Sequence, residues 1–159
     1  MDKKKLIKLI AEQLEKDLLA AREAAFATYQ AATHEESKPE NEYDTRGLEA
    51  SYLAGAQSKR VAEIEELAFI YKDLEVKNFS ANDKISSTAL VEVELKGRRS
   101  FIFIMSKGGG LIMNVDGFAI QIVTPTSPLG EALLGLKVGD VAVVENGDNV
   151  REYQILSLS

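Results

Sequence analysis

The chain of 159 residues is 45% hydrophobic and 28% charged, which is typical of a globular protein with one domain or two small ones. It has no cysteine and a single histidine, so disulfides, thiolate catalysis, the common structural zinc sites and a multi-histidine metal site are excluded. The formal net charge of −6 argues against free binding to nucleic acid through a broad basic surface, because phosphate neutralisation needs clustered lysine and arginine.

Most of the excess of acidic over basic side chains lies in the first half of the chain. Residues 1–83 carry 12 basic against 17 acidic side chains, whereas residues 84–159 carry 7 against 8. The N-terminus begins basic and then turns apolar, but Glu12, Glu15 and Asp17 interrupt this stretch before it reaches the length of a signal peptide or a membrane span. We therefore expect a cytoplasmic protein with no membrane partner.

Two long helices are predicted in the first half, over about 5–32 and 44–76. In each segment apolar residues recur every three or four positions, which places them on one helical face. Pro39 lies in the polar segment between them and forbids one continuous helix, so the simplest arrangement is an antiparallel hairpin. The two predicted stripes are Ile7, Ile10, Leu14, Leu18, Ala21, Ala25 and Thr28, and Leu53, Ala56, Arg60, Ile64, Leu67, Tyr71 and Leu74.

From residue 84 the hydrophobic period changes from helical to alternating, which indicates strands. Inside this region Ser127 suits a helix N-cap, Pro128 suits the first helical position and Gly135 suits the end of the same short helix. We therefore expect the second half of the chain to form a compact, mostly antiparallel sheet of about five strands with one short helix. The strand candidates are residues 88–95, 100–105, 111–113, 118–123, 138–144 and 150–156.

The predicted fold class is therefore α+β. Residues 1–77 form the helical hairpin, with an acidic tip near residues 34–44. Residues 78–84 form a hinge, and residues 85–159 form the β domain with its short helix.

The segment from Ser127 to Val144 resembles the C-terminal motif of the GreA and GreB transcript cleavage factors, in which Ser-Pro opens a short helix and a Gly-Asp turn leads to a strand. The ending from Tyr153 to Leu158 is similar to the last strand of that family. Glu40-Asn-Glu-Tyr43 is similar to the family's tip pattern with one residue missing. The resemblance implies an FKBP-like C-terminal domain and a coiled-coil hairpin that enters the secondary channel of RNA polymerase.

The resemblance also implies site residues. Ser127, Pro128 and Leu129 lie where Gre factors dock on the rim of the polymerase channel. The tip carboxylates Glu36 and Glu40 take the place of the acids that assist the polymerase's own transcript cleavage. Together with Glu42 they are candidate Mg²⁺ ligands, since Mg²⁺ keeps several waters and is held by one or two carboxylates. The chain is then not an enzyme itself and binds no cofactor alone; it shares Mg²⁺ with the docked polymerase and meets nascent RNA only indirectly.

The tip departs from the family pattern, in which the two key acids are three residues apart. If the chain is aligned at Glu40, Ser37 falls where the key aspartate belongs. If it is aligned back from Tyr43 without a gap, Glu36 replaces the aspartate and Pro39 replaces the glutamate. Either way only one of the two acids is in place.

Three functions stay open on this evidence. The first is an elongation factor that stimulates cleavage of backtracked transcripts. The second is a regulator that occupies the polymerase channel without cleavage, which the acid spacing and Pro39 favour. The third is an adaptor or oligomer built from the coiled coil, because Leu6, Leu9 and Leu19 lie beside the main stripe and are available to pair with a second copy. A monomer is favoured, with a dimer as the alternative.

Overall fold

The computed structural model describes residues 2–34, 45–147 and 149–159. Within these ranges the chain forms three helices and six strands, with the two long helices first and the strands after them. The α+β class predicted from the two hydrophobic periods is confirmed.

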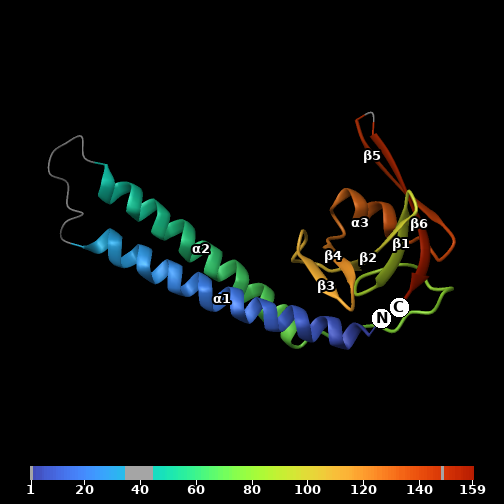
Figure 1. The fold of residues 1–159 in the computed structure, drawn as a ribbon, viewed down its shortest axis with the longest axis horizontal. Helices are drawn as coiled ribbons and strands as arrows, with labels where there is room; N and C mark the ends of the chain where they lie inside the picture. The colour runs from blue at the N-terminus through green and yellow to red at the C-terminus, as the bar shows by residue number, and fades with distance from the viewer. Residues whose placement is uncertain (1, 35–44, 148) are drawn as a thin grey trace. The chain divides into compact units, whose positions relative to one another are not determined.

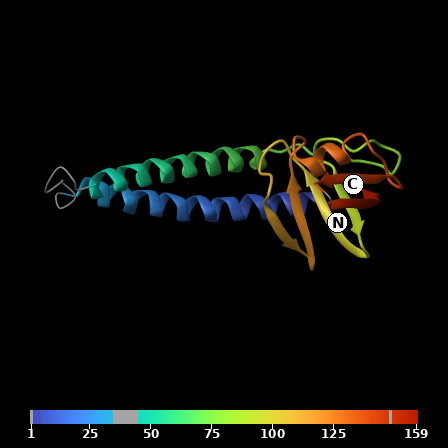
Figure 2. The same ribbon diagram turned by 90° about the horizontal axis from the view of Figure 1, so that it is seen from above.

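The two long helices are α1 (Lys3–Thr33) and α2 (Arg46–Lys72). They run antiparallel and side by side in both views (Figures 1 and 2). An ion pair between Arg22 of α1 and Glu65 of α2 links them. The predicted hairpin is therefore confirmed, with helix boundaries within a few residues of those expected.

The packing face of α1 agrees with the predicted stripe. Ile10 and Leu14 are buried, and Ala21, Ala25 and Thr28 farther along the helix are half-buried between exposed neighbours. The side chains on this face become smaller toward the tip. Because buried apolar area sets the hydrophobic stabilisation, the hairpin gains less of it toward the tip than near its base.

The packing face of α2 differs from the prediction in its first half. The sequence places Leu53, Ala56 and Arg60 on the packing face, but all three are exposed, and this expectation is wrong. In this half of α2 the expected stripe was built on Leu53, the largest apolar residue of the three. The structure turns smaller side chains inward there, which allows a closer approach of two helices. The half-buried stripe consists of Gly47, Ala50, Ala54, Gln57 and Val61, and it continues into the buried Ile64 as predicted.

Large apolar side chains are consequently left on the outside of the hairpin. Tyr52 is 73% exposed and Phe69 is 75% exposed. Single exposed apolar residues are ordinary on protein surfaces, whereas contiguous exposed apolar patches commonly mark interaction sites. The exposed set on the hairpin is Leu19, Phe26, Tyr29, Leu48, Tyr52, Leu53 and Phe69.

The second half of the chain forms one sheet with the strand order β3-β4-β2-β1-β6-β5. The pair β2·β4 is parallel and the remaining pairs are antiparallel. The expectation of a mostly antiparallel sheet is confirmed, with six strands in place of about five. The single parallel pair arises because the β3–β4 hairpin returns β4 alongside β2. The strands are β1 (Leu90–Leu95), β2 (Arg98–Ile104), β3 (Ile112–Val115), β4 (Phe118–Val123), β5 (Val141–Asn146) and β6 (Asn149–Leu158).

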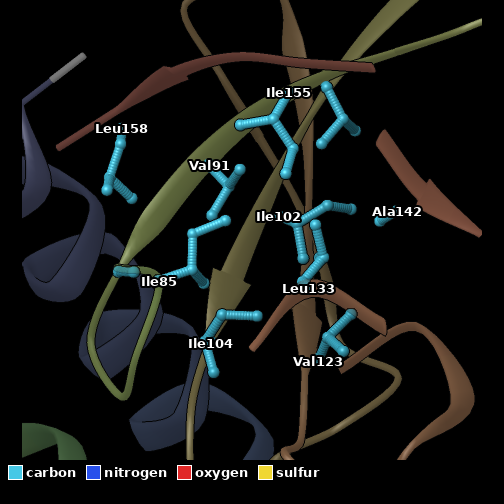
Figure 3. Close-up of a cluster of buried hydrophobic side chains, with 11 residues drawn as sticks. Ile85, Val91, Ile102, Ile104, Val123, Leu133, Ala142, Ile155 and Leu158 are labelled. Carbon is cyan, nitrogen blue, oxygen red and sulfur yellow. The ribbon is translucent and has the colours of Figure 1, made fainter. Parts of the chain in front are cut away.

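The core of this half lies between the sheet and the short helix α3 (Pro128–Leu133). Val91 and Val93 of β1 are fully buried, while Glu92 and Glu94 alternate with them, as the period of two predicts. Figure 3 shows Leu133 of α3 pointing toward the strand residues of this cluster. The cluster consists of Ile85, Ala89, Val91, Val93, Ile102, Ile104, Val123, Leu133, Ala142, Ile155 and Leu158.

By internal contacts the chain divides into a hairpin unit, residues 7–74, and a sheet unit, which combines residues 75–159 with the chain before residue 7. The first turn of α1 therefore belongs to the sheet unit. Its Leu6 is fully buried, so the expectation that Leu6 is available to pair with a second copy is wrong. Its Lys5 Nζ lies 2.6 Å from Oδ1 of Asp116 in the β3–β4 turn.

The ammonium group of Lys3 is buried in the sheet unit. It donates hydrogen bonds to the carbonyl oxygens of Lys77 and Thr88, the latter at 3.2 Å, and lies 4.8 Å from the centre of the Phe79 ring. Thr88 adopts a φ of 67°, which is strained for a β-branched residue. In the described part of the chain Lys3 forms no ion pair, and burial lowers the pKa of its ammonium group.

This lowered pKa predicts a pH dependence. Between the folded pKa of Lys3 and its ordinary value of 10.5, the unfolded chain binds more protons than the folded chain. The free energy of unfolding therefore rises as the pH increases through that window. Urea unfolding from about pH 7 to about pH 10 should show wild type gaining stability relative to Lys3→Met. A constant difference between the two proteins across this range would contradict the expectation.

Candidate docking surface

The start of α3 carries the residues predicted to dock, and Ser127 caps the helix. Its Oγ accepts a hydrogen bond from the backbone N–H of Gly130 at 3.1 Å and donates one to the carbonyl oxygen of Thr124 at 2.7 Å. Pro128 occupies the first helical position, where no intrahelical N–H is needed. The expected N-cap and helix start are confirmed, and they hold the exposed Pro128 and half-buried Leu129 at a defined place on the surface.

Gly130 allows α3 to lie directly against the end of β4. A Cβ atom at this position would stand 2.0 Å from the carbonyl oxygen of Thr124 and 3.0 Å from the Oγ of Ser127. The first of these contacts is with backbone, so a rotamer change cannot relieve it. The position of α3 against the end of β4 therefore requires glycine at residue 130. This requirement was not identified from the sequence.

The other end of α3 is tied to the segment before β1. Gly135, with a φ of 81°, donates its N–H to the carbonyl oxygen of Ile85 at 2.9 Å. Ile85 in turn donates its N–H to the carbonyl oxygen of Leu136 at 2.8 Å. Gly135 follows the helix as predicted, and these two bonds together with the Ser127 cap fix the short helix at both ends.

A groove of about 640 Å³ opens beside the start of α3. Ser127, Pro128 and Leu129 line it together, so the structure gathers the predicted docking residues around one concave surface. The opposite wall comes from β5 and β6 and was missed from the sequence. In the strand register Val144 pairs with Arg151 and Ala142 pairs with Tyr153. The alternation in β6 places Arg151 and Tyr153 on one face, but only the lining of the groove shows that this face borders the start of α3.

Arg151 is the basic side chain of the groove. It is exposed and forms no ion pair with any residue that the structure describes. By contrast, Arg99 on β2 lies 3.5 Å from a carboxylate oxygen of Glu92 and 3.7 Å from one of Glu94. Glu145 lines the same groove, so the groove carries one acidic and one basic side chain.

The predicted tip acids Glu36, Glu40 and Glu42 lie outside the described residues. In the ranges that the structure does describe, no group of three or more histidine, aspartate or glutamate side chains is placed to hold a metal ion. None of the described helices is both long and apolar enough to cross a membrane.

Residues 80–159 match the family described as Transcription elongation factor, GreA/GreB, C-term. The chain belongs to this GreA/GreB family, whose members are transcription factors and not catalysts themselves, and the resemblance seen in the sequence is confirmed.

Several relatives are named proteins. The chain is 28% identical to transcription inhibitor protein Gfh1 of Thermus thermophilus over 120 residues, which cover 74% of this chain and 73% of that protein. It is 26% identical to Gfh1 of Thermus aquaticus, covering 97% and 95% of the two chains. It is also 26% identical to transcription elongation factor GreA of Methylococcus capsulatus, covering 83% and 78%.

Two solved structures are similar along most of the chain. The crystal structure of GreA factor homolog 1 (Gfh1) of Thermus thermophilus matches at 20% identity and a TM-score of 0.38, with 94% of each chain covered. The structure of Thermus aquaticus Gfh1 matches at 22% identity and a TM-score of 0.38, with 92% of each chain covered.

Proposed function

We propose that this protein binds RNA polymerase, places its hairpin in the secondary channel and inhibits transcription without stimulating transcript cleavage. The observation that carries the proposal is the composition of the tip, where one of the two family acids is replaced by Ser37 or by Pro39, depending on the alignment. The relatives named transcription inhibitor, at 28% and 26% identity, support the inhibition of transcription.

The tip chemistry argues against efficient cleavage. A metal pair stabilises the attacking and leaving oxygens of the reaction only when its ligands hold both ions in place. Neither alignment gives this chain two carboxylates at the family spacing. The donor set therefore fits a second Mg²⁺ poorly, whereas the remaining acids still make the tip strongly negative.

The hairpin surface supports insertion into a partner. Its small residues pack inward along the second helix, while Phe26, Tyr29 and Tyr52 remain exposed. Aromatic residues are enriched in protein interfaces because each buries a large area with few rotatable bonds. One hairpin fills one channel, so we expect the factor to act as a monomer in the cytoplasm and to meet nascent RNA only indirectly.

Transcription assays with purified RNA polymerase test the proposal. We expect the protein to reduce runoff product from a promoter template while leaving the transcripts of stalled, backtracked complexes at full length. Mg²⁺ is varied in the second assay, because a weak site fills only at high metal concentration. Polymerase binding without any effect on product would contradict inhibition.

Stimulation of cleavage is the second candidate, favoured by the similarity to GreA of Methylococcus capsulatus and by the acids Glu36 and Glu40. Shortened transcripts in the stalled complexes would select it. In that case Glu36→Ala and Glu40→Ala should each reduce cleavage, and the stronger effect would identify the acid that assists the polymerase.

A further inference from the structure

We propose that Lys3 is a positioning residue: its buried ammonium group fastens both ends of the hairpin to the sheet unit, so that docking of the sheet unit also places the hairpin. This inference rests on the proposed function, because it names the residue through which the docked sheet unit holds the hairpin in the polymerase channel. Lys3 and every residue that its ammonium group contacts belong to the sheet unit.

The chain passes between the hairpin unit and the sheet unit at residues 6–7 and again at residues 74–75. The predicted docking residues lie in the sheet unit, whereas the exposed Phe26, Tyr29 and Tyr52 lie on the hairpin. Docking and insertion are therefore two linked binding events, and the stiffness of the two connections sets the effective concentration of the second event. Contacts that hold both connections on the sheet unit raise this effective concentration.

The first connection is held by the first turn of α1. Leu6 is fully buried, and Lys5 is paired with Asp116. Nζ of Lys3 donates a hydrogen bond to the carbonyl oxygen of Thr88 at 3.2 Å, although the two residues are 85 positions apart in the sequence. The start of the hairpin is thereby attached to the segment that leads into β1.

The second connection is held by the same ammonium group. Nζ of Lys3 also donates a hydrogen bond to the carbonyl oxygen of Lys77, which follows α2. The backbone N–H of Lys77 donates to Oγ1 of Thr88 at 3.2 Å, and the N–H of Thr88 donates to the carbonyl oxygen of Ile104 at 2.8 Å. One side chain thus joins the chain that enters the hairpin, the chain that leaves it and the sheet.

The energetic cost of these contacts points to a role beyond filling space. Lys3 is only 8% exposed and has no ion pair among the described residues, and burying a charge without a counter-ion is unfavourable. Thr88 has a φ of 67°, and a strained residue persists only where its surroundings hold it. An apolar side chain would fill the same space without charge. What the ammonium group adds is the pair of hydrogen bonds to the two carbonyl oxygens.

Distance measurements on the free protein test these contacts without polymerase. The chain has no cysteine, so spin labels can be attached through Glu23→Cys in the hairpin and Arg98→Cys in the sheet unit, both at exposed positions. In double electron–electron resonance, Lys3→Met should broaden the distribution of label-to-label distances, because the stem of the side chain is kept while both hydrogen bonds are lost. Lys4→Met makes the same charge change at an exposed neighbour and should leave the distribution unchanged.

Inhibition of runoff transcription by the unlabelled full-length protein tests the consequence. Lys3→Met should need about tenfold more protein than wild type for half-maximal inhibition, because looser connections lower the effective concentration of the hairpin at the channel. Lys4→Met should inhibit as wild type does. A contribution of Lys3 to stability alone would not broaden the distances in a protein that is folded at the assay temperature.

Thermal unfolding shows whether each variant is folded. If Lys3→Met is unfolded, Thr88→Gly decides in both experiments: glycine accepts the positive φ, while the N–H of Lys77 loses its acceptor and the second connection loosens. It should change distances and inhibition in the same direction as Lys3→Met.

The failures are distinguishable. Distances in the folded variant as narrowly distributed as in wild type would overturn the inference and leave the proposed function standing. Broadened distances with undiminished inhibition would reject the positioning role. Failure of wild type to bind polymerase or to inhibit it would remove the proposed function and the positioning role with it, whatever the distances show.

Discussion

Ser37→Asp is expected to convert the factor into one that stimulates transcript cleavage. The substitution places an aspartate three residues before Glu40, which is the spacing of the two acids in the family pattern. A second carboxylate would complete the oxygen ligands that the tip offers to a metal ion at the polymerase site. Groups that stabilise developing charge in a transition state commonly change rates on the order of a hundredfold, so we expect a comparable gain in cleavage rate. Cleavage of stalled complexes at several Mg²⁺ concentrations measures it.

Ser37→Asn is the matched control, because asparagine resembles aspartate in size but lacks its negative charge. It should bind polymerase as wild type does and remain inactive in cleavage. Pro39→Glu tests the ungapped alignment in the same assay, with Glu36 as the first acid. If neither acidic variant stimulates cleavage although both bind polymerase, the missing carboxylates are not the reason why the tip fails to stimulate cleavage.

Gly130→Ala is expected to cost more stability than any surface substitution in the sheet unit. The new Cβ would stand 2.0 Å from the carbonyl oxygen of Thr124, so α3 must move away from β4. Overpacking of this kind typically costs about 1–3 kcal/mol, and a backbone clash lies at the upper end of that range. Calorimetry should show the transition of the sheet unit lowered by roughly 10 °C. Polymerase binding should weaken too, because the same shift displaces Pro128 and Leu129.

Gly55→Ala is the control, because its expected effect on stability has the opposite sign. Gly55 lies inside α2, and a Cβ there would meet nothing within 4 Å. Alanine is favoured over glycine in a helix by about 0.5–1 kcal/mol, so this variant should be slightly more stable than wild type. Equal losses of stability in both variants would show that the contact with Thr124 does not decide the outcome.

Local rules were sufficient for most of the fold. The helical spacing and Pro39 predicted the hairpin, and the hydroxyl of Ser127 followed by proline predicted the start of α3. These features depend on residues that are close in sequence. They can therefore be read before any long-range contact is known.

Features that depend on pairing were harder to predict. On α2 the inward face carries Ala50 and Ala54 while Leu53 points to solvent, so the size of the apolar residue misled the choice of face. The parallel β2·β4 pair and the second wall of the groove depend on strand order and register. Arg151 has no motif around it, and its position opposite Val144 follows only from the ladder between the last two strands.

The placement of the first helical turn has a practical consequence for dissecting this protein. Lys3 and Leu6 complete the sheet unit although the hairpin separates them in sequence from residues 75–159. A fragment beginning at residue 75 would lack both, leaving an uncovered hydrophobic surface and two carbonyl groups without their donor. The sheet unit is thus assembled from two separate segments of the polypeptide. An expression fragment that starts after the hairpin would therefore not reproduce its structure.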